Sequence, residues 1–170
     1  MTDAQTLGEV VAKGRVRPEW IDYNAHMNVA YYVLAFDLAI DALWERLGIT
    51  SEYIERTRGS TFAVETHVTY QRELCENDPY FVTMELIAYD EKRIHQLQRM
   101  YHEEQGYLAA TAEWMSLHVD LSRRKVSAWP PEVLAVLAEI AASQPPADRS
   151  DDICGRMRVK SPIYRLAPTA

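Results

Sequence analysis

The amino-acid sequence predicts an α+β fold in which one long helix is covered by an antiparallel sheet. Apolar residues recur with helical spacing from Asn28 to about Leu47, whereas the segments that follow alternate apolar and polar residues with a period of two. A helix of about 20 residues is roughly 30 Å long and needs a wide sheet to bury its apolar surface. Short connections between successive strands favour an antiparallel meander.

The segment before the long helix is expected to hold one short strand and a polar tract. Residues 1–11 read as a flexible lead-in, and residues 14–18 predict a strand that ends near Pro18 and Glu19. The polar tract occupies residues 22–28. Asn28 is the expected N-cap of the helix, and Gly48 is its expected C-terminal stop.

Four strands and a second helix are expected after a loop at residues 50–60. The strands are predicted over residues 62–70, 80–89, 94–103 and 107–121, and the C-terminal helix over residues 132–142. A Pro-rich, charged tail follows over residues 143–170, with one extended piece at residues 156–160. We therefore predict a single domain over residues 12–142.

Composition excludes several classes of protein. The 170 residues are 48% hydrophobic and 25% charged, and the net charge of −7 argues against a general nucleic-acid binder. No apolar run approaches the ~20 residues of a membrane span, and the N-terminus has no signal pattern, so a cytoplasmic location is expected. Cys75 and Cys154 lack metal-ligand spacing and are expected to be free thiols, with no metal site.

The polar tract is the strongest functional signal. In an extended segment, alternation would direct Asp22, Asn24, His26 and Asn28 to one side. Polar groups beside a helix N-terminus suit a site where negative charge develops. This arrangement could polarise a carbonyl and activate water.

The tract also resembles a known family. Residues 18–28, followed by Ala30, Tyr31 and Tyr32, resemble the hotdog-fold acyl-CoA thioesterases, and residues 66–70 resemble the second strand of that family. The resemblance covers roughly residues 12–140. It implies the hotdog fold, a long central helix wrapped by a curved antiparallel β-sheet plus a C-terminal helix, and hydrolysis of an acyl-CoA thioester to free acid and CoA.

Variants within the family differ at the acidic position. The 4-hydroxybenzoyl-CoA thioesterases use an Asp where this chain has Asn24, so that assignment does not transfer. The plant acyl-carrier thioesterases have Asp-x-Asn-x-His, which Asp22, Asn24 and His26 match. Residues 65–70 and 117–120 also resemble the betainyl-CoA thioesterases associated with carnitine and betaine degradation.

The chemistry assigns a role to each residue of the tract. Asp22 is the candidate base or nucleophile, and the sequence leaves the two roles open. His26 would share the proton or donate to the carbonyl, and Asn24 would orient water or the thioester. Free backbone N–H groups near Asn28 and Val29 would hold the oxyanion.

Two further acids have competing interpretations. Glu65 lies in an alternating strand, where a solvated or paired role is the ordinary one and a second acid facing the site is the functional one. Asp37 lies on the apolar helix, where an ion pair with an arginine is favoured over catalysis.

Aromatic and basic residues supply candidates for substrate binding. An acyl pocket could be lined by Tyr31, Tyr32 and Trp114, and core packing is the alternative, favoured for Trp44. Aromatic faces would attract a trimethylammonium group if the substrate carries one. The candidates for CoA phosphate binding, each of which could instead be an ordinary solvated arginine, are Arg72, Arg93, Arg123 and Arg124.

The sequence and the resemblance also give expectations about the ligand, the oligomeric state and alternative functions. The expected ligand is a small-molecule acyl-CoA substrate with no cofactor, and CoA is favoured over an acyl carrier protein. The resemblance implies a homodimer with the active site at the subunit interface, which could pair again into a homotetramer. The alternatives are a non-hydrolytic acyl-CoA-binding hotdog protein and a dehydratase or hydratase on the same fold.

Overall fold

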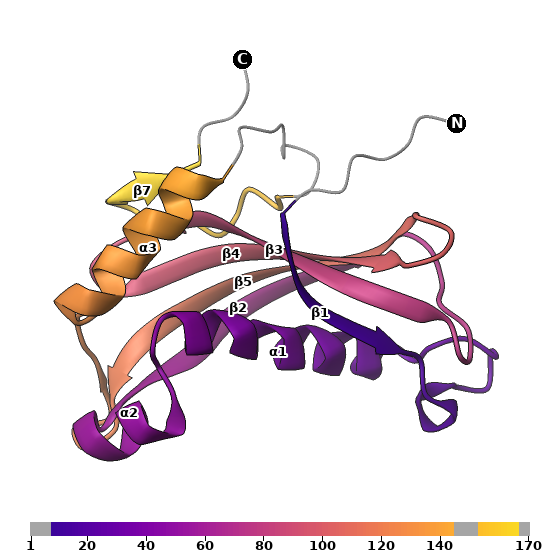
Figure 1. Cartoon of the computed structure of the whole chain (residues 1–170), viewed down its shortest axis with the longest axis horizontal. Coiled ribbons are helices and arrows are strands. Elements are labelled where there is room, and N and C mark those ends of the chain that lie inside the picture. The colour runs from indigo at the N-terminus through magenta and orange to yellow at the C-terminus, as the bar shows by residue number, and fades with distance from the viewer. Residues whose placement is uncertain (1–7, 145–152, 167–170) are drawn as a thin grey trace. The chain divides into compact units, whose positions relative to one another are not determined.

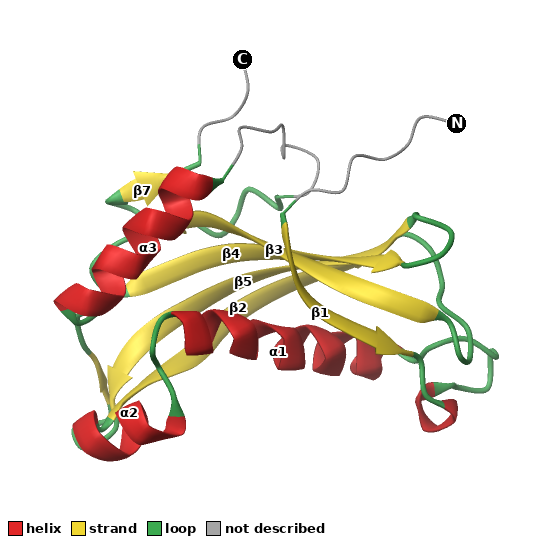
Figure 2. Cartoon of the chain, in the orientation of Figure 1, coloured by secondary structure: helices red, strands yellow, loops and turns green. Residues whose placement is uncertain are grey.

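The computed structural model describes residues 8–144 and 153–166, and these contain the predicted long helix, the strands and the C-terminal helix (Figures 1 and 2). Most of the predicted lead-in and part of the predicted tail lie outside the described residues. The elements, in chain order, are β1 (Glu9–Arg15), a 3₁₀ turn (Pro18–Trp20), α1 (Val29–Arg46), α2 (Ser51–Thr57), β2 (Gly59–Tyr70), β3 (Pro79–Tyr89), β4 (Arg93–His102), β5 (Leu108–Asp120), β6 (Lys125–Val126), α3 (Pro131–Ser143) and β7 (Tyr164–Arg165).

The strands pair in an order that differs from the predicted meander. The sheet runs β1-β3-β4-β5-β2, with β6 on β5 and β7 on β3. Strand β2 therefore lies beside β5 and not beside β3, its neighbour in sequence. The connection from β2 to β3 is not a tight turn, because it spans residues 71–78, and the Leu74 carbonyl within it accepts a hydrogen bond from the Met27 N–H at 2.7 Å.

Both predicted helices are confirmed, and one short helix was missed. The periodic segment forms α1, and Gly48 follows it with a positive φ of 72°, as a helix stop requires. The expected loop at residues 50–60 contains α2, whose N-cap residue Thr50 accepts a hydrogen bond from Tyr53 N–H. Within the described part of the chain, none of the helices combines the length and apolarity that crossing a bilayer requires.

The strand predictions fail mainly at the two ends of the chain. Strand β1 begins at Glu9, inside the predicted lead-in, and pairs antiparallel with β3. The predicted extended piece at residues 156–160 is not a strand. Instead, Tyr164 and Arg165 form β7, which pairs antiparallel with Tyr89 and Ala88 of β3.

The chain forms two compact units, and each unit combines three separate stretches of sequence. The first unit comprises Met1–Ala42, Val68–Glu85 and Gln98–Ala112, and the second comprises Leu43–His67, Leu86–Leu97 and Glu113–Ala170. The main strands run from one unit into the other, so the division follows no boundary along the sequence. The domain limits predicted from the sequence stay a prediction.

In the first unit, α1 buries its apolar face against the sheet. Phe36 is fully buried, and its carbonyl accepts a hydrogen bond of 3.0 Å from the Gln98 amide of β4. Buried charge in this unit is paired, because Arg99 and Glu85 form an ion pair in which each side chain is 1% exposed. Removing one partner of such a pair would leave an uncompensated buried charge.

In the second unit, the segment after α3 packs on the sheet. Met157 and Val159 are buried in one cluster with Ala88 and Met115. Nearby, Glu113 is 1% exposed and its carboxylate lies 2.7 Å from His95 Nε2. Burial alone would raise the pKa of Glu113, but hydrogen bonds from His95 and Cys154 outweigh it and hold that pKa below the ordinary value.

Candidate functional site

The polar tract closes into a turn and does not run as an extended strand. Ile21 and Met27 form an isolated antiparallel bridge, and the Asp22 N–H donates to the His26 carbonyl at 3.1 Å. The Ala25 N–H donates to the Asp22 carbonyl, and Ala25 has a positive φ of 65°. The predicted alternation is therefore wrong, because the chain reverses within the tract.

The turn brings Asp22 and His26 together. Asp22 Oδ1 lies 3.8 Å from His26 Nδ1, and the two side chains are 14% and 33% exposed. The same Oδ1 accepts a 2.8 Å hydrogen bond from the Asn24 N–H, which orients the carboxylate. The Asn24 side chain is exposed, so its backbone contacts Asp22 while its amide group stays in solvent.

The N-terminus of α1 lies next to this pair. Asn28 caps the helix as predicted, because its Oδ1 accepts from the Ala30 N–H at 3.0 Å. Its own N–H donates to the Trp20 carbonyl at 2.9 Å, so the prediction of a free Asn28 N–H is wrong. The Tyr31 N–H is also engaged, by the Asn28 carbonyl. Val29 N–H has no acceptor within the described residues and is the donor left for an oxyanion.

A second contact anchors the tract from the segment after β2. The Met27 N–H donates to the Leu74 carbonyl at 2.7 Å, and the Leu74 N–H donates to the Tyr32 hydroxyl at 2.8 Å. Burial raises the pKa of Tyr32 to about 12, against the opposing effect of the Leu74 hydrogen bond. The Tyr32 hydroxyl is therefore a neutral, fixed hydrogen-bond partner at working pH.

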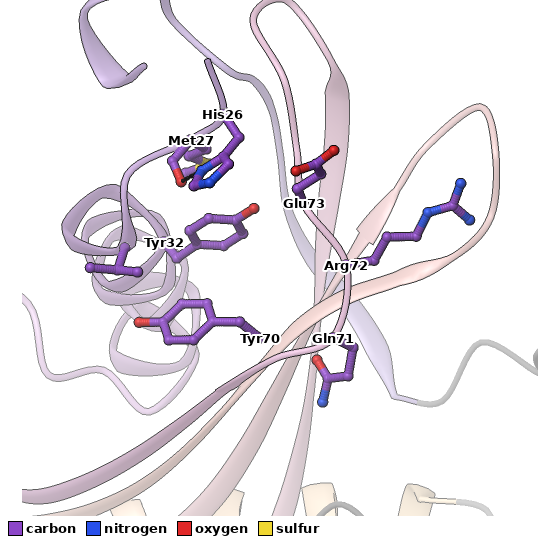
Figure 3. A pocket seen from close by; sticks show the side chains of 8 residues that line it. His26, Met27, Tyr32, Tyr70, Gln71, Arg72 and Glu73 are labelled. Carbon is purple, nitrogen blue, oxygen red and sulfur yellow. Dashed lines mark hydrogen bonds between the residues drawn. The ribbon is translucent and has the colours of Figure 1, made fainter. Parts of the chain in front are cut away.

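A pocket of about 210 Å³ opens beside these residues. Figure 3 shows the Tyr32 ring between His26 and Tyr70, with Glu73 across from His26. The Tyr32 and Tyr70 rings meet edge to face at 5.4 Å. The pocket is lined by His26, Met27, Val29, Tyr32, Tyr70, Gln71, Arg72 and Glu73.

Several predicted residues of the first unit are placed differently from expectation. Asp22 does not line the pocket directly, whereas His26 does. Tyr31 stacks on Trp20 at 5.5 Å and does not line the pocket. Asp37 is exposed on α1, and the expected arginine partner is absent within the described residues. An exposed carboxylate needs no partner, because water solvates it.

Among the arginines predicted for CoA binding, Arg72 lies at the pocket. Its guanidinium carbon lies 4.0 Å from the centre of the Tyr107 ring, and the side chain is otherwise exposed. The other predicted residues belong to the second unit and do not line this pocket. They are Glu65 (exposed), Trp114 (buried), Arg93 (paired with Asp90 at 3.0 Å), Arg123 and Arg124 (both exposed), and the half-buried Trp44.

Apart from Arg72, sequence reasoning missed the part of the pocket wall that comes from the end of β2 and the segment after it. Tyr70 ends β2 and Gln71 and Glu73 follow it, where the pattern predicted only a strand end and a connection. Their one signal was position, since they end a strand expected to cover the helix. Their approach to His26 depends on Leu74, whose backbone contacts no local pattern encodes.

Comparison with known proteins identifies the family. The sequence model that describes the thioesterase-like superfamily matches residues 16–137 of this chain. This chain belongs to that superfamily.

Curated relatives agree with this assignment. A betainyl-CoA thioesterase of Pseudomonas aeruginosa is 35% identical over 126 residues, which cover 74% of this chain and 79% of the relative. An L-carnitine dehydrogenase/betainyl-CoA thioesterase of Rhizobium meliloti is 36% identical over 137 residues, which cover 81% of this chain. The match spans only 27% of that longer protein.

A solved structure supports the fold. The hypothetical protein SAV2348 of Staphylococcus aureus, determined in complex with CoA, aligns with a TM-score of 0.82 and 26% identity. The alignment covers 91% of this chain and 98% of that chain. The predicted α+β hotdog class is confirmed.

Proposed function

We propose that this protein hydrolyses acyl-CoA thioesters to the free acid and CoA. The observation that carries the proposal is the Asp22–His26 pair beside the free N–H of Val29, at a pocket next to the N-terminus of α1. Thioester hydrolysis needs a proton acceptor for water and a donor for the oxyanion, and this arrangement supplies both. Membership in the thioesterase-like superfamily supports the same reaction.

In the proposed reaction, the Asp22–His26 pair removes a proton from water as the water oxygen attacks the thioester carbonyl carbon. His26 is the member of the pair that lines the pocket, and Asp22 stabilises the imidazolium behind it. The negative charge on the carbonyl oxygen is held by Val29 N–H and the positive end of the α1 dipole. The C–S bond then breaks, and the CoA thiolate leaves and takes up a proton.

Chemical rescue tests this division of roles. Exogenous imidazole should restore part of the turnover of His26→Ala, because the missing proton acceptor faces the pocket. It should not restore Asp22→Asn, in which the imidazole is still present. If Asp22 is instead the nucleophile, the reaction passes through a mixed anhydride, and water attack on its Asp22 carbonyl carbon places ¹⁸O in the Asp22 carboxyl group during a single turnover in ¹⁸O-water; label found there would show that the proposed base mechanism is wrong.

We propose that Arg72 contacts the phosphates of CoA. It is the predicted arginine that lines the pocket, and its guanidinium is fixed over the Tyr107 ring while its outer edge stays in solvent. A guanidinium presents paired N–H donors that match phosphate oxygens.

The acyl group that best fits the pocket is small and cationic. The rings of Tyr32 and Tyr70 and the carboxylate of Glu73 are groups that attract a quaternary ammonium. The relatives named as betainyl-CoA thioesterases support a trimethylammonium acyl group. We therefore propose betainyl-CoA, or a close cationic analogue, as the substrate.

A pair of matched substrates tests the acyl group. Thiol release should be compared for betainyl-CoA and 3,3-dimethylbutyryl-CoA, which replaces the charged nitrogen with carbon in the same shape. The proposal predicts a clear preference for the charged ester, reduced by Glu73→Gln and unchanged by Glu76→Gln, which lies outside the pocket lining. Equal rates would refute the cationic substrate. Tight binding of both esters without thiol release would favour a non-hydrolytic acyl-CoA-binding protein.

We propose that two copies of the chain form a homodimer through β2. This strand ends the sheet order, and it exposes Phe62 and Val64 at 41% and 55%. An exposed apolar edge strand is a site for pairing with another chain. Light scattering should give the mass of a dimer, or of a tetramer if dimers pair again, and Val64→Lys should shift the mass toward the monomer. A monomeric wild type at micromolar concentration would refute this assembly.

A further inference from the structure

Three chemically different side chains, none of which lines the pocket, meet in the second unit. They are His67 of β2, Glu113 of β5 and Cys154 of the segment after α3. One imidazole nitrogen, one carboxylate oxygen and the thiol sulfur all lie within 4.8 Å of one another. The three residues are far apart in the sequence, so the cluster results from the fold.

The fold holds the strands of this cluster in register. Strands β2 and β5 are hydrogen-bonded neighbours, and the Thr66 hydroxyl donates to the Glu113 carbonyl at 3.1 Å. This bond places the next residue, His67, alongside Glu113. His67 is exposed in the single chain, where its imidazole can rotate toward a ligand.

Glu113 is oriented by two donors. His95 Nε2 lies 2.7 Å from one carboxylate oxygen, and the Cys154 N–H donates to the other at 2.7 Å. Each oxygen keeps a second lone pair for another partner. Carboxylates that bind metal ions are commonly held in this way by a hydrogen bond from a second group.

Cys154 is held in place by the same contact and by packing. Its backbone bonds to Glu113, and its side chain packs against the cluster formed by Ala88, Met115, Met157 and Val159. The thiol is half-buried and makes no disulfide. An oriented thiol beside an imidazole and a carboxylate offers the sulfur, nitrogen and oxygen ligands that zinc accepts, whereas Ca²⁺ and Mg²⁺ prefer oxygen ligands alone.

We propose that His67, Glu113 and Cys154 bind a Zn²⁺ ion that ties the segment after α3 to β2 and β5. At the usual Zn–N, Zn–O and Zn–S lengths, ligand atoms of a tetrahedral site lie roughly 3.3–3.8 Å apart. The ligand atoms, all within 4.8 Å of one another, therefore need to approach by no more than about 1.5 Å on binding, which rotation of the exposed His67 side chain can supply. Water completes the fourth position, and the ion takes no part in the proposed hydrolysis.

Cobalt substitution is the direct test. The full chain, reduced and treated with EDTA, is titrated with Co²⁺ and then with Zn²⁺. We expect one equivalent of Co²⁺ to give a thiolate-to-cobalt charge-transfer band and strong visible bands of a four-coordinate ion, both removed by Zn²⁺. Absence of the charge-transfer band in the wild type would overturn the proposal.

The second cysteine of the chain provides a matched control. Cys154→Ser should abolish the charge-transfer band, whereas Cys75→Ser, at an exposed thiol outside the cluster, should retain it. His67→Ala should weaken Zn²⁺ binding at least tenfold. Because His67 is exposed, this substitution should leave the chain folded, so weaker binding would report the loss of a ligand. A band that survives in Cys154→Ser or disappears in Cys75→Ser would refute the site.

Thermal stability gives a readout that is independent of activity. An ion that binds only the folded chain raises its melting temperature in proportion to the logarithm of its concentration. Zn²⁺ should raise the melting temperature of the wild type and of Cys75→Ser but not that of His67→Ala. His95→Gln should weaken Zn²⁺ binding by about 10–100-fold, because it removes the group that orients Glu113. An equal response of all variants would mean that the metal binds elsewhere.

Discussion

Tyr32→Phe tests how the segment after β2 holds the site. Tyr32 is 4% exposed, and its hydroxyl accepts the hydrogen bond of the Leu74 N–H, whose residue is fully buried. Phenylalanine preserves the ring but leaves this donor without an acceptor. An unsatisfied buried donor costs about 1–3 kcal/mol.

The expected loss of stability is measurable. For a chain of 150–250 residues, 1 kcal/mol corresponds to a shift in melting temperature of about 2–4 °C, so Tyr32→Phe should melt roughly 2–12 °C lower. Because burial raises the pKa of Tyr32 to about 12, the hydroxyl is neutral and the loss should not vary with pH through the neutral range. Turnover should fall as well, since the Leu74 carbonyl binds the Met27 N–H of the polar tract.

Urea denaturation at fixed protein concentration measures the free energy of unfolding directly. The matched control is Tyr31→Phe. Its ring stacks on Trp20, and its hydroxyl has no hydrogen bond within the described residues, so the change should be below about 0.5 kcal/mol. If both variants unfold at the same urea concentration as the wild type, the Leu74 anchor contributes no stability and the reasoning fails.

Three further predictions follow from individual contacts. Burial lowers the pKa of His118, so the unfolded chain binds a proton at this residue more readily than the folded chain does. The free energy of unfolding should therefore fall as the pH drops below about 6.5, and it should fall less in His118→Gln than in EDTA-treated His67→Gln. Gly59→Ala would put a Cβ 2.7 Å from the Tyr53 hydroxyl and 2.8 Å from His118 Nε2, so urea denaturation should show a loss of about 1–3 kcal/mol, and no loss would contradict the packing. Arg72→Gln should raise KM for CoA esters at least fivefold with little change in kcat, whereas Arg123→Gln should not; equal KM values would exclude Arg72 from CoA binding.

Helix α1 and the strands from β2 to β5 were predictable because a local period encodes each of them. The helical period fixed α1 to within one residue at each end, and the alternation of two located β2, β3, β4 and β5. Helix α2 was missed because its seven residues are too few to show a period. The partner of β2 was also missed, since strand order depends on the path of residues 71–78 and not on the strand itself.

The site was predictable in its residues but not in its shape. Asp22 and His26 were chosen by type and by their position before a helix, and the structure brings them to 3.8 Å. The turn that does so requires Ala25 in the left-handed region, which a residue other than glycine rarely adopts and no pattern signals. The sequence predicted free N–H groups near both Asn28 and Val29, and only the hydrogen bond from the Asn28 N–H to the Trp20 carbonyl shows which of the two is engaged.

The proposed zinc site shows where sequence-spacing rules for metal ligands fail. Cysteine and histidine motifs identify metal sites when the ligands are close in sequence. His67, Glu113 and Cys154 come from three distant segments, so only the pairing of β2 with β5 and the return of the chain after α3 bring them together.

The central claim is that Asp22 and His26 act together in hydrolysis at the N-terminus of α1. The most direct test measures thiol release from betainyl-CoA by the wild type, Asp22→Asn, His26→Gln and Tyr23→Ala. Tyr23 lies in the same turn but is 96% exposed, so its variant controls for disturbance of the turn. We predict that Asp22→Asn and His26→Gln each lose about 10²–10⁴ in kcat while Tyr23→Ala retains wild-type turnover. Wild-type turnover in either Asp22→Asn or His26→Gln would contradict the proposed site.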